Sequence, residues 1–177
     1  MTNTPQPQPG PTQRGPATAT TAETTTLALD ELGTYAGRNL GRSSWYKITQ
    51  EQVDLFADAT GDHQWIHVDP ERAKAGPFGQ TIAHGYLTLS MAPVLLAEVL
   101  TVNGVALVIN YGANRVRFPS PVLVGSQLRA SVDLIELTAV EGGAQATFRM
   151  TFETEGAAKP ACVAEIVYRY YQGDTEG

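Results

Sequence analysis

The sequence predicts an α+β fold in which one apolar helix lies across the concave face of a curved antiparallel sheet. The most apolar segment, residues 84–100, is hydrophobic nearly all round, so we expect it to be a buried central helix. Four stretches rich in β-branched and aromatic residues follow it, at 106–118, 126–140, 144–153 and 161–171. Hydrophobic helices followed by a run of antiparallel strands are typical of this fold class.

Length and composition predict a single domain behind an N-terminal tail. The chain has 177 residues, and residues 1–26 consist mainly of Pro, Gln, Thr and Ala, with almost no large apolar side chain. Such a segment buries too little surface to offset its ordering entropy, so we expect 1–26 to be disordered and 27–177 to form one domain. The tail lacks the basic start and apolar core of a signal peptide. No apolar run approaches the roughly 20 residues that a membrane span requires.

Net charge and cysteine content exclude several classes of protein. The formal net charge of −6 argues against general nucleic-acid binding, which requires a basic face. The only cysteine, Cys162, excludes an intramolecular disulfide and a cysteine-rich zinc site. Because it lies in an apolar strand pattern, we interpret it as a buried structural thiol. These observations favour a cytoplasmic protein with neither nucleic acid nor membrane as a partner.

The first half of the chain should contain one well-defined helix after two less regular segments. Residues 27–42 predict a short helical lead-in, and residues 44–48 predict a first short strand. A clearer helix is expected over 49–59, because Thr49 can cap its start and Gln52 can reach back to complete a capping box.

Glycine and proline set the expected boundaries of the later elements. Gly61 should end the helix at 49–59, and Pro70, at a first-turn position, predicts a short helix that ends near residue 76. Pro93 lies inside the apolar segment and removes a backbone hydrogen bond, so it predicts a kink or a boundary. The pair Gly142-Gly143 suits a hairpin between two of the long strands.

All three histidines, and the densest run of chemically capable side chains, lie between residues 60 and 86. The unperturbed pKa of histidine lies nearest neutrality, so acid–base chemistry is expected here. Asp62 and His67, five residues apart, make a possible acid–base pair. We interpret His63 as a partly exposed loop residue. His84 is expected to orient the start of the central helix through a hydrogen bond.

A metal site is the main alternative for these residues. Its candidate ligands are His63 and His67, four residues apart, with Asp62, Asp69 and His84 nearby. That spacing binds zinc when it lies on a helix, but Gly61, the β-branched Ile66 and Pro70 argue against a continuous helix. We therefore expect no metal, and we interpret Asp69 as the cap of the short helix that Pro70 begins.

A longer ordered motif surrounds this pair. It comprises Phe56-Ala57, Gly61-Asp62, Ile66-His67-Val68-Asp69-Pro70, Ala73, Phe78, Ile82-Ala83-His84-Gly85 and Ser90. The motif closely resembles the (R)-specific enoyl-CoA hydratases of the MaoC-like dehydratase family, and the run from Gly61 to Asp69 is most similar to the branch that includes the nodulation protein NodN. The resemblance covers roughly residues 49–171. It implies the hot-dog fold, a sheet wrapped around a central helix, and a homodimer in which two sheets pair edge to edge.

The resemblance also implies roles for individual residues. Asp62 and His67 match the residues that hold and activate the catalytic water, and Gly85 matches the glycine whose backbone N–H faces the thioester oxygen. Two positions depart from the family pattern. Gln64-Trp65 replace the commoner Asn-Pro, and Pro93 stands where some members carry a serine. We therefore expect an altered substrate fit with the Asp–His pair kept.

The chemistry of hydration explains why these residue types are needed. Water addition across a 2-enoyl thioester requires a base for the water, an acid for Cα and a group that stabilises the enolate-like oxygen. We expect Asp62 to be the base and His67 to be the water ligand and proton donor. A backbone N–H at a helix start can stabilise the oxygen, and Gly85 lets a ligand approach closely because it lacks a Cβ atom.

Further contacts to the substrate are expected around the motif. The candidate residues are Gln64, Trp65, His84, Tyr86 and Arg117. Trp65 and Tyr86 are more often packing residues than pocket lining. Arg115, Arg117 and Lys74 offer cations for the nucleotide of coenzyme A, although a solvated surface position is the usual role of such charges.

Two other functions remain open at this point. An acyl-CoA thioesterase on the same fold would attack the carbonyl and release a free thiol. A non-catalytic acyl-thioester-binding module would bind its ligand without turnover, because function depends on the site and not on the fold. No cofactor is expected, since coenzyme A would be part of the substrate. The acyl chain length and the carrier, coenzyme A or acyl carrier protein, are left open.

Overall fold

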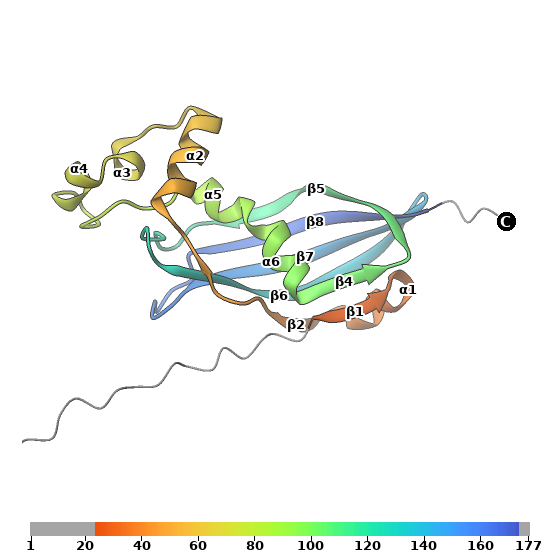
Figure 1. The fold of residues 1–177 in the computed structure, drawn as a ribbon. Helices are drawn as coiled ribbons and strands as arrows, with labels where there is room; N and C mark the ends of the chain where they lie inside the picture. The colour runs from red at the N-terminus through yellow and green to blue at the C-terminus, as the bar shows by residue number, and fades with distance from the viewer. Residues whose placement is uncertain (1–23, 174–177) are drawn as a thin grey trace, which may run out of the picture.

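In the computed structural model, which describes residues 24–173, a curved sheet wraps around two short consecutive helices (Figure 1). The six-stranded sheet has the order β2-β6-β7-β8-β5, and β3 pairs with β6 outside this path. Neighbouring strands are antiparallel throughout. The expected α+β fold, with a helix across a curved sheet, is therefore confirmed. Most of the expected tail, 1–26, lies outside the described residues, and Thr25 and Thr26 belong to a strand.

Four long strands form most of the sheet. They are β5 (Val105–Arg117), β6 (Gln127–Val140), β7 (Gly143–Thr154) and β8 (Cys162–Gln172). Val140 pairs with Gly143, so Glu141 and Gly142 form the tight turn between β6 and β7, and Gly142 has a positive φ of 74°. The expected hairpin is confirmed, with Gly143 already inside the strand. Cys162 is fully buried, as expected, and burial raises its pKa to about 11.

The central helical segment is divided in two. It consists of α5 (Gly85–Ser90) and α6 (Ala92–Val99), and Pro93 lies in the first turn of α6. A first-turn proline lacks only an N–H that would have no intrahelical acceptor, so the expected boundary at Pro93 is confirmed. The expectation of burial on all sides was wrong for this chain, because Tyr86 is 71% exposed and Val94 is 50% exposed.

The N-terminal elements differ from the expected helical lead-in. The segment contains β1 (Thr25–Ala28), α1 (Leu29–Leu32), the 3-10 turn η1 (Gly33–Tyr35) and β2 (Arg38–Arg42). β1 pairs in parallel with β4 (Leu100–Asn103), a strand that the sequence does not predict, since Leu100 is expected to end the central helix. The predicted strand at 44–48 is reduced to β3 (Tyr46–Lys47).

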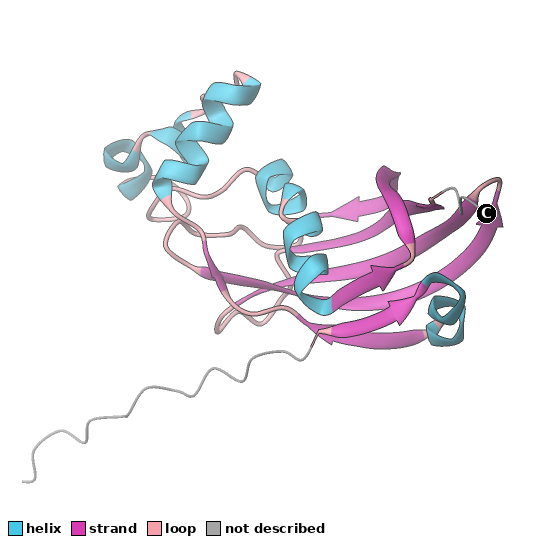
Figure 2. Ribbon diagram, turned by 45° about the vertical axis from the view of Figure 1, so that its right-hand side comes forward, coloured by secondary structure: helices cyan, strands magenta, loops and turns pink. Residues whose placement is uncertain are grey.

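Three short helices project beyond one end of the sheet, next to the start of α5 (Figures 1 and 2). They are α2 (Gln50–Thr60), α3 (Trp65–Val68) and α4 (Pro70–Lys74). The capping box of α2 forms as predicted, since Thr49 Oγ1 accepts from the Gln52 N–H and Gln52 Oε1 accepts from the Thr49 N–H. Gly61 ends this helix with a φ of 78°. No helix in the described part of the chain is long and apolar enough to cross a membrane.

Candidate active site

The polar residues of the motif converge where α2, α3 and α5 meet. Asp62 follows α2, His67 lies within α3, and His84 immediately precedes α5. One side-chain nitrogen or oxygen from each of the three residues lies within 4.8 Å of the others. The fold therefore brings together the predicted Asp62–His67 pair and adds His84 to it.

His67 is fixed in one tautomer by its surroundings. The side chain is buried, and its Nδ1 lies 2.7 Å from the carbonyl oxygen of Ile82. A carbonyl only accepts hydrogen bonds, so Nδ1 carries the proton and Nε2 is left as an acceptor. Burial lowers the pKa of His67 from its ordinary value of 6.5, because desolvation disfavours the charged form, and the neighbouring His84 lowers it further. His67 is therefore a neutral acceptor near pH 7.

A glutamine that was not among the predicted site residues, Gln50, holds the backbone of His67. Gln50 Nε2 donates to the carbonyl oxygen of His67 at 2.7 Å and to Asp54 Oδ1 at 2.8 Å. Its Oε1 accepts a hydrogen bond from Thr81 Oγ1 at 2.6 Å. Gln50 thus ties α2 to α3 and to the segment before α5. Such a contact joins residues far apart in the chain, so no local sequence motif predicts it.

His84 connects the start of α5 to the turn that carries Asp62. Its Nε2 lies 2.9 Å from the carbonyl oxygen of Asp62 and donates to it, which is the kind of hydrogen bond expected of this residue. The ring is 3% exposed and stacks on His67 with a centroid distance of 3.8 Å and an interplanar angle of 27°. Phe56 covers it at a centroid distance of 5.0 Å. Its Nδ1 is buried and has no hydrogen-bond partner among residues 24–173.

Asp62, His67 and His84 are also the residues that could hold a metal ion. One feature of the histidines opposes this role. Their rings stack with an interplanar angle of 27°, so the lone pairs of the two nitrogens that do not donate to a carbonyl, Nε2 of His67 and Nδ1 of His84, lie in nearly parallel planes. Zinc requires lone pairs that converge on one point about 2.0 Å away. The arrangement suits hydrogen bonding to a water or a substrate better than coordination.

Asp62 and His63 are neighbours with different surroundings. Asp62 is exposed, and within the described part of the chain its Oδ1 accepts only a long hydrogen bond of 3.4 Å from the Gln64 N–H, so the carboxylate is available to a ligand. His63 instead turns toward α2, where Nε2 lies 2.9 Å from Asp58 Oδ1, and this hydrogen bond raises the pKa of His63. The interpretation of His63 as an exposed loop residue agrees with this position.

A cavity of about 280 Å³ opens beside the histidine pair. It is lined by residues near the start of α5 and by residues that are distant in sequence: His67, Phe78, Ile82, Ala83, Gly85, Thr88, Phe118, Pro119, Ser120, Pro121, Val122 and Ala161. Gly85 begins α5, so its N–H has no intrahelical acceptor. A Cβ atom at Gly85 would lie 3.3 Å from the Phe118 ring, so a glycine allows this close approach. Phe118 and Thr88 were not predicted to line the site, because neither belongs to a local motif that would identify it.

The remaining predicted substrate contacts lie outside this cavity. None of Gln64, Trp65, Tyr86 and Arg117 is among the described residues that line it. Trp65 packs under Arg72, whose guanidinium carbon lies 4.5 Å from the ring centroid. Tyr86 is mostly exposed and meets Phe118 edge-on at a centroid distance of 6.2 Å.

The cationic candidates do not gather at the cavity either. Arg117 is exposed and donates to the adjacent Val116 carbonyl at 2.8 Å, and Arg115 is exposed on the same strand. Lys74 forms an exposed ion pair with Glu71 at 2.6 Å. These positions agree with ordinary surface charges.

Comparison with known proteins places this site in a wider context. Residues 31–155 match the family described as MaoC like domain. The chain is 60% identical over 144 residues to 3-hydroxyacyl-thioester dehydratase Z of Mycobacterium tuberculosis, a match that covers 81% of this chain and 95% of the relative. It is 42% identical over 145 residues to nodulation protein N of Rhizobium leguminosarum bv. viciae, covering 80% and 89%. A solved (R)-hydratase from A. caviae involved in PHA biosynthesis has a TM-score of 0.60 at 29% identity, covering 75% of this chain and 94% of that one.

Proposed function

Because the chain belongs to the MaoC-like domain family, we propose that it is a hydro-lyase that acts on acyl thioesters. The proposed reaction is the reversible addition of water across a trans-2-enoyl thioester, which yields an (R)-3-hydroxyacyl thioester. The family match, the identity to a 3-hydroxyacyl-thioester dehydratase and the likeness to an (R)-hydratase support this reaction.

The observation that carries the proposal is the pairing of neutral His67 with Asp62 beside a cavity that also contains Gly85. A water held between the Asp62 carboxylate and Nε2 of His67 donates one hydrogen bond to each. As its oxygen bonds to Cβ, one of its protons passes to the pair and the C=C electrons move onto the thioester oxygen. The Gly85 N–H stabilises that oxygen. The enolate then collapses, and Cα takes a proton from the pair.

The tautomer of His67 refines the division of labour expected from the sequence. With Nδ1 donating to Ile82, Nε2 enters the reaction unprotonated. It can therefore give a proton to Cα only after the pair has taken one from water. In this scheme the proton that reaches Cα is the one released by the attacking water, and the pair returns to its starting state after each turnover.

The decisive experiment follows the loss of enoyl absorbance with crotonyl-CoA and longer enoyl-CoA substrates, with chiral analysis of the product. We expect loss of absorbance and formation of the (R)-3-hydroxyacyl thioester. Release of free thiol without prior loss of the enoyl group would identify a thioesterase instead. Binding of enoyl-CoA without either reaction would identify a non-catalytic binding module.

The proposal includes a homodimer formed through the free edge of the sheet. β5 pairs only with β8, so its other edge is open among the described strands. Four large apolar residues of β5 are 40–56% exposed: Leu107, Val108, Ile109 and Tyr111. Long apolar edge strands are usually protected by pairing. Light scattering should give twice the mass of the chain, and Ile109→Lys should shift the protein toward monomer.

Carrier, cofactor and location complete the proposal. The substrate is an acyl thioester of coenzyme A or of an acyl carrier protein, and Arg115 and Arg117 are the candidate contacts to the phosphates of its carrier. The reaction requires no cofactor beyond the carrier, which is part of the substrate. We place the protein in the cytoplasm, which agrees with its single, buried cysteine.

A further inference from the structure

The ring of His67 is held by the irregular segment that precedes α5, and not by its own helix. Ile82 accepts the hydrogen bond from Nδ1 through its carbonyl at 2.7 Å, and it donates its own N–H to the Ile66 carbonyl at 3.0 Å. Because a carbonyl can only accept, the first of these bonds keeps the proton of His67 on Nδ1. The tautomer therefore depends on the spacing between the segment of His67 and the segment of Ile82.

Neither of these two segments is rigid enough to fix that spacing by itself. The helix that carries His67, α3, has only four residues, and no side chain caps its start. Isolated helices shorter than about 12 residues are marginal in water, so a single turn depends on outside contacts for its position. The segment around Ile82 belongs to none of the named strands and forms an isolated bridge with Leu123. Contacts from elsewhere in the fold therefore decide how far apart the two segments lie.

The side chain of Gln50 joins the same two segments, one at each end of its amide group. Its Nε2 donates to the carbonyl oxygen of His67 at 2.7 Å, and its Oε1 accepts from Thr81 Oγ1 at 2.6 Å. Thr81 is 4% exposed and directly precedes Ile82. One amide thus holds the backbone of the histidine and also the backbone next to the carbonyl that fixes its ring. These hydrogen bonds form a closed network.

The chemistry of this network explains why position 50 carries a glutamine. The His67 carbonyl requires a donor, and the Thr81 hydroxyl donates to an acceptor, so the bridging group must offer one of each. A side-chain amide does so, whereas a carboxylate has no donor and an alkyl chain has neither group. Gln50 also begins α2, an eleven-residue helix whose first turn is fixed by a capping box. The amide therefore has a firmer support than α3 provides.

Gln50 acts on the reaction only through His67. It is not among the described residues that line the cavity beside α5, so it does not contact a substrate bound there. We propose that Gln50 is a positioning residue for hydration: its amide holds His67 against the Ile82 carbonyl and so keeps Nε2 unprotonated and directed at the catalytic water. This inference rests on the proposed function. It makes the orientation of the base depend on α2, an element outside the cavity.

The first test compares Gln50→Ala with Gln80→Ala as a matched control. Gln80 is an exposed glutamine whose Nε2 also donates to a backbone carbonyl, that of Val124, at 2.9 Å. For crotonyl-CoA we expect Gln50→Ala to lower kcat by about tenfold and to leave KM within about twofold, because a misplaced catalytic group slows the chemical step. Gln80→Ala should match the wild type. A rise in KM with unchanged kcat would place Gln50 in substrate binding, and equal losses in both variants would reflect stability; either result overturns the inference.

The second test asks whether the network or the single residue matters. Thr81→Val removes the hydroxyl and keeps the shape of the side chain, whereas Thr81→Ser keeps the hydroxyl. We expect Thr81→Val to lower kcat by about threefold, which corresponds to one lost hydrogen bond, and Thr81→Ser to retain the wild-type value. Gln50→Ala combined with Thr81→Val should lose no more than Gln50→Ala alone, because both changes act on one network. Losses that multiply in the double variant would contradict the inference.

A measurement without substrate separates this inference from the proposed function. Nitrogen chemical shifts of isotope-labelled histidines report which ring nitrogen carries the proton. His67 and His84 should show opposite tautomers, because Nδ1 of the first and Nε2 of the second donate to carbonyls, and His67→Gln would assign the signals. We expect a mixture of tautomers at His67 in Gln50→Ala and no change in Gln80→Ala. If this change occurs but the wild type does not hydrate crotonyl-CoA, the proposed function is wrong and the positioning of His67 by Gln50 stands. An unchanged His67 tautomer in Gln50→Ala overturns the inference.

Discussion

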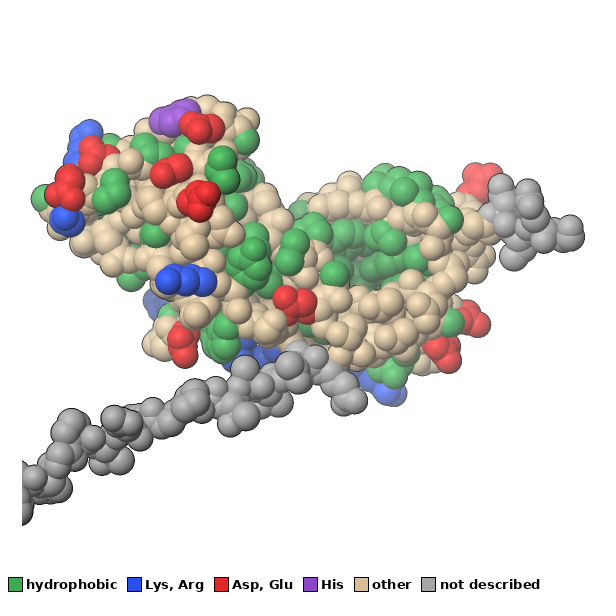
Figure 3. All heavy atoms as spheres, viewed as in Figure 1, with side chains coloured by type: hydrophobic (Ala, Val, Ile, Leu, Met, Phe, Trp, Pro, Cys, Tyr) green, Lys and Arg blue, Asp and Glu red, His purple; other side chains and the backbone are tan. Residues whose placement is uncertain are grey.

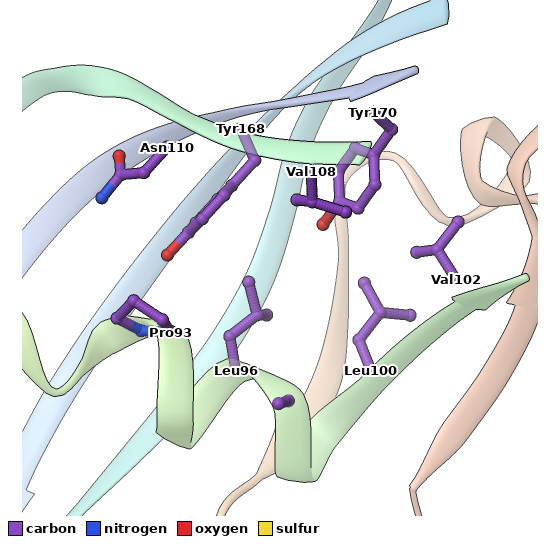
Figure 4. Close-up of a pocket in the computed structure, with 9 residues that line it drawn as sticks. Pro93, Leu96, Leu100, Val102, Val108, Asn110, Tyr168 and Tyr170 are labelled. Atoms are coloured by element: carbon purple, nitrogen blue, oxygen red, sulfur yellow. The ribbon is translucent and has the colours of Figure 1, made fainter. Parts of the chain in front are cut away.

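The titratable cluster beside α5 and an apolar groove along α6 are built in opposite ways. Beside α5, Asp62, His67 and His84 come from one short stretch of sequence and supply polar, titratable groups. Along α6, a groove of about 360 Å³ is assembled from the helix and from residues of β4, β5 and β8, and its walls are apolar except near Tyr168 and Asn110 (Figures 3 and 4). The comparison teaches that local sequence can encode the chemistry of a site, whereas the shape that selects a substrate depends on contacts between distant segments.

The largest effect should come from the titratable cluster of Asp62, His67 and His84. Asp62→Ala and His67→Ala should each lower kcat/KM for crotonyl-CoA by about 10²–10⁴-fold, the usual contribution of general acid–base catalysis. His63→Ala is the matched control, because His63 is exposed and interacts with Asp58 instead. Steady-state kinetics and circular dichroism of the purified variants would check both activity and folding. Turnover like that of the wild type in either of the first two variants would remove the pair from the mechanism.

The pH dependence should come from His67 and not from its exposed neighbour. Burial lowers the pKa of His67 from 6.5, so its neutral form persists below that pH and kcat/KM should fall only on the acid side of 6.5. Below that pKa, a single protonation lowers the rate by about tenfold per pH unit. His63→Gln should leave the profile unchanged, although the pKa of His63 is raised. If kcat/KM began to fall already above pH 6.5, and if that fall moved in His63→Gln, the group that controls the profile would be His63 and the prediction would be wrong.

The lowered pKa of His67 also makes the free energy of unfolding depend on pH. The folded pKa of His67 is lower than the unfolded value, so the unfolded chain binds the proton more readily. The resulting contribution to the free energy of unfolding is complete above about pH 6.5 and is lost as the pH falls through the lowered pKa. Urea unfolding at several pH values should show this loss in the wild type and a smaller loss in His67→Gln.

A smaller effect is expected where the cavity beside α5 meets the sheet. In Gly85→Ala the added Cβ would lie 3.3 Å from the Phe118 ring, so the ring or the start of α5 must shift by a few tenths of an ångström. Such a displacement of the N–H should lower kcat for crotonyl-CoA by about tenfold, because catalysis is sensitive to the placement of its groups. Phe118→Leu in the same background should restore part of the loss. Equal losses in the single and double variants would show that the ring is not the cause.

The same contrast explains how much the sequence could predict. Asp62, His67 and Gly85 were predictable because a continuous motif carries them, and the division of the central helix was predictable from Pro93. β4 was not, because Leu100–Asn103 continues the apolar run of α6 and its partner β1 lies 75 residues earlier, Thr25 being paired with Leu100. Gln50 and Phe118 were also missed, because their roles arise only when distant segments pack together. Tertiary contacts decide such positions, and one sequence does not display them.

The smallest expected effect lies in the apolar groove. Ala97 lines it from the exposed side of α6, and Leu forms helices nearly as well as Ala, so Ala97→Leu should narrow the groove without loss of the helix. If the groove holds the distal acyl chain, kcat/KM should fall a few-fold for ten- and twelve-carbon enoyl-CoA substrates and stay unchanged for crotonyl-CoA. A parallel loss for crotonyl-CoA would mean that α6 also controls the chemistry. The two cavities would then be one functional unit, and the separation between chemistry and fit would fail.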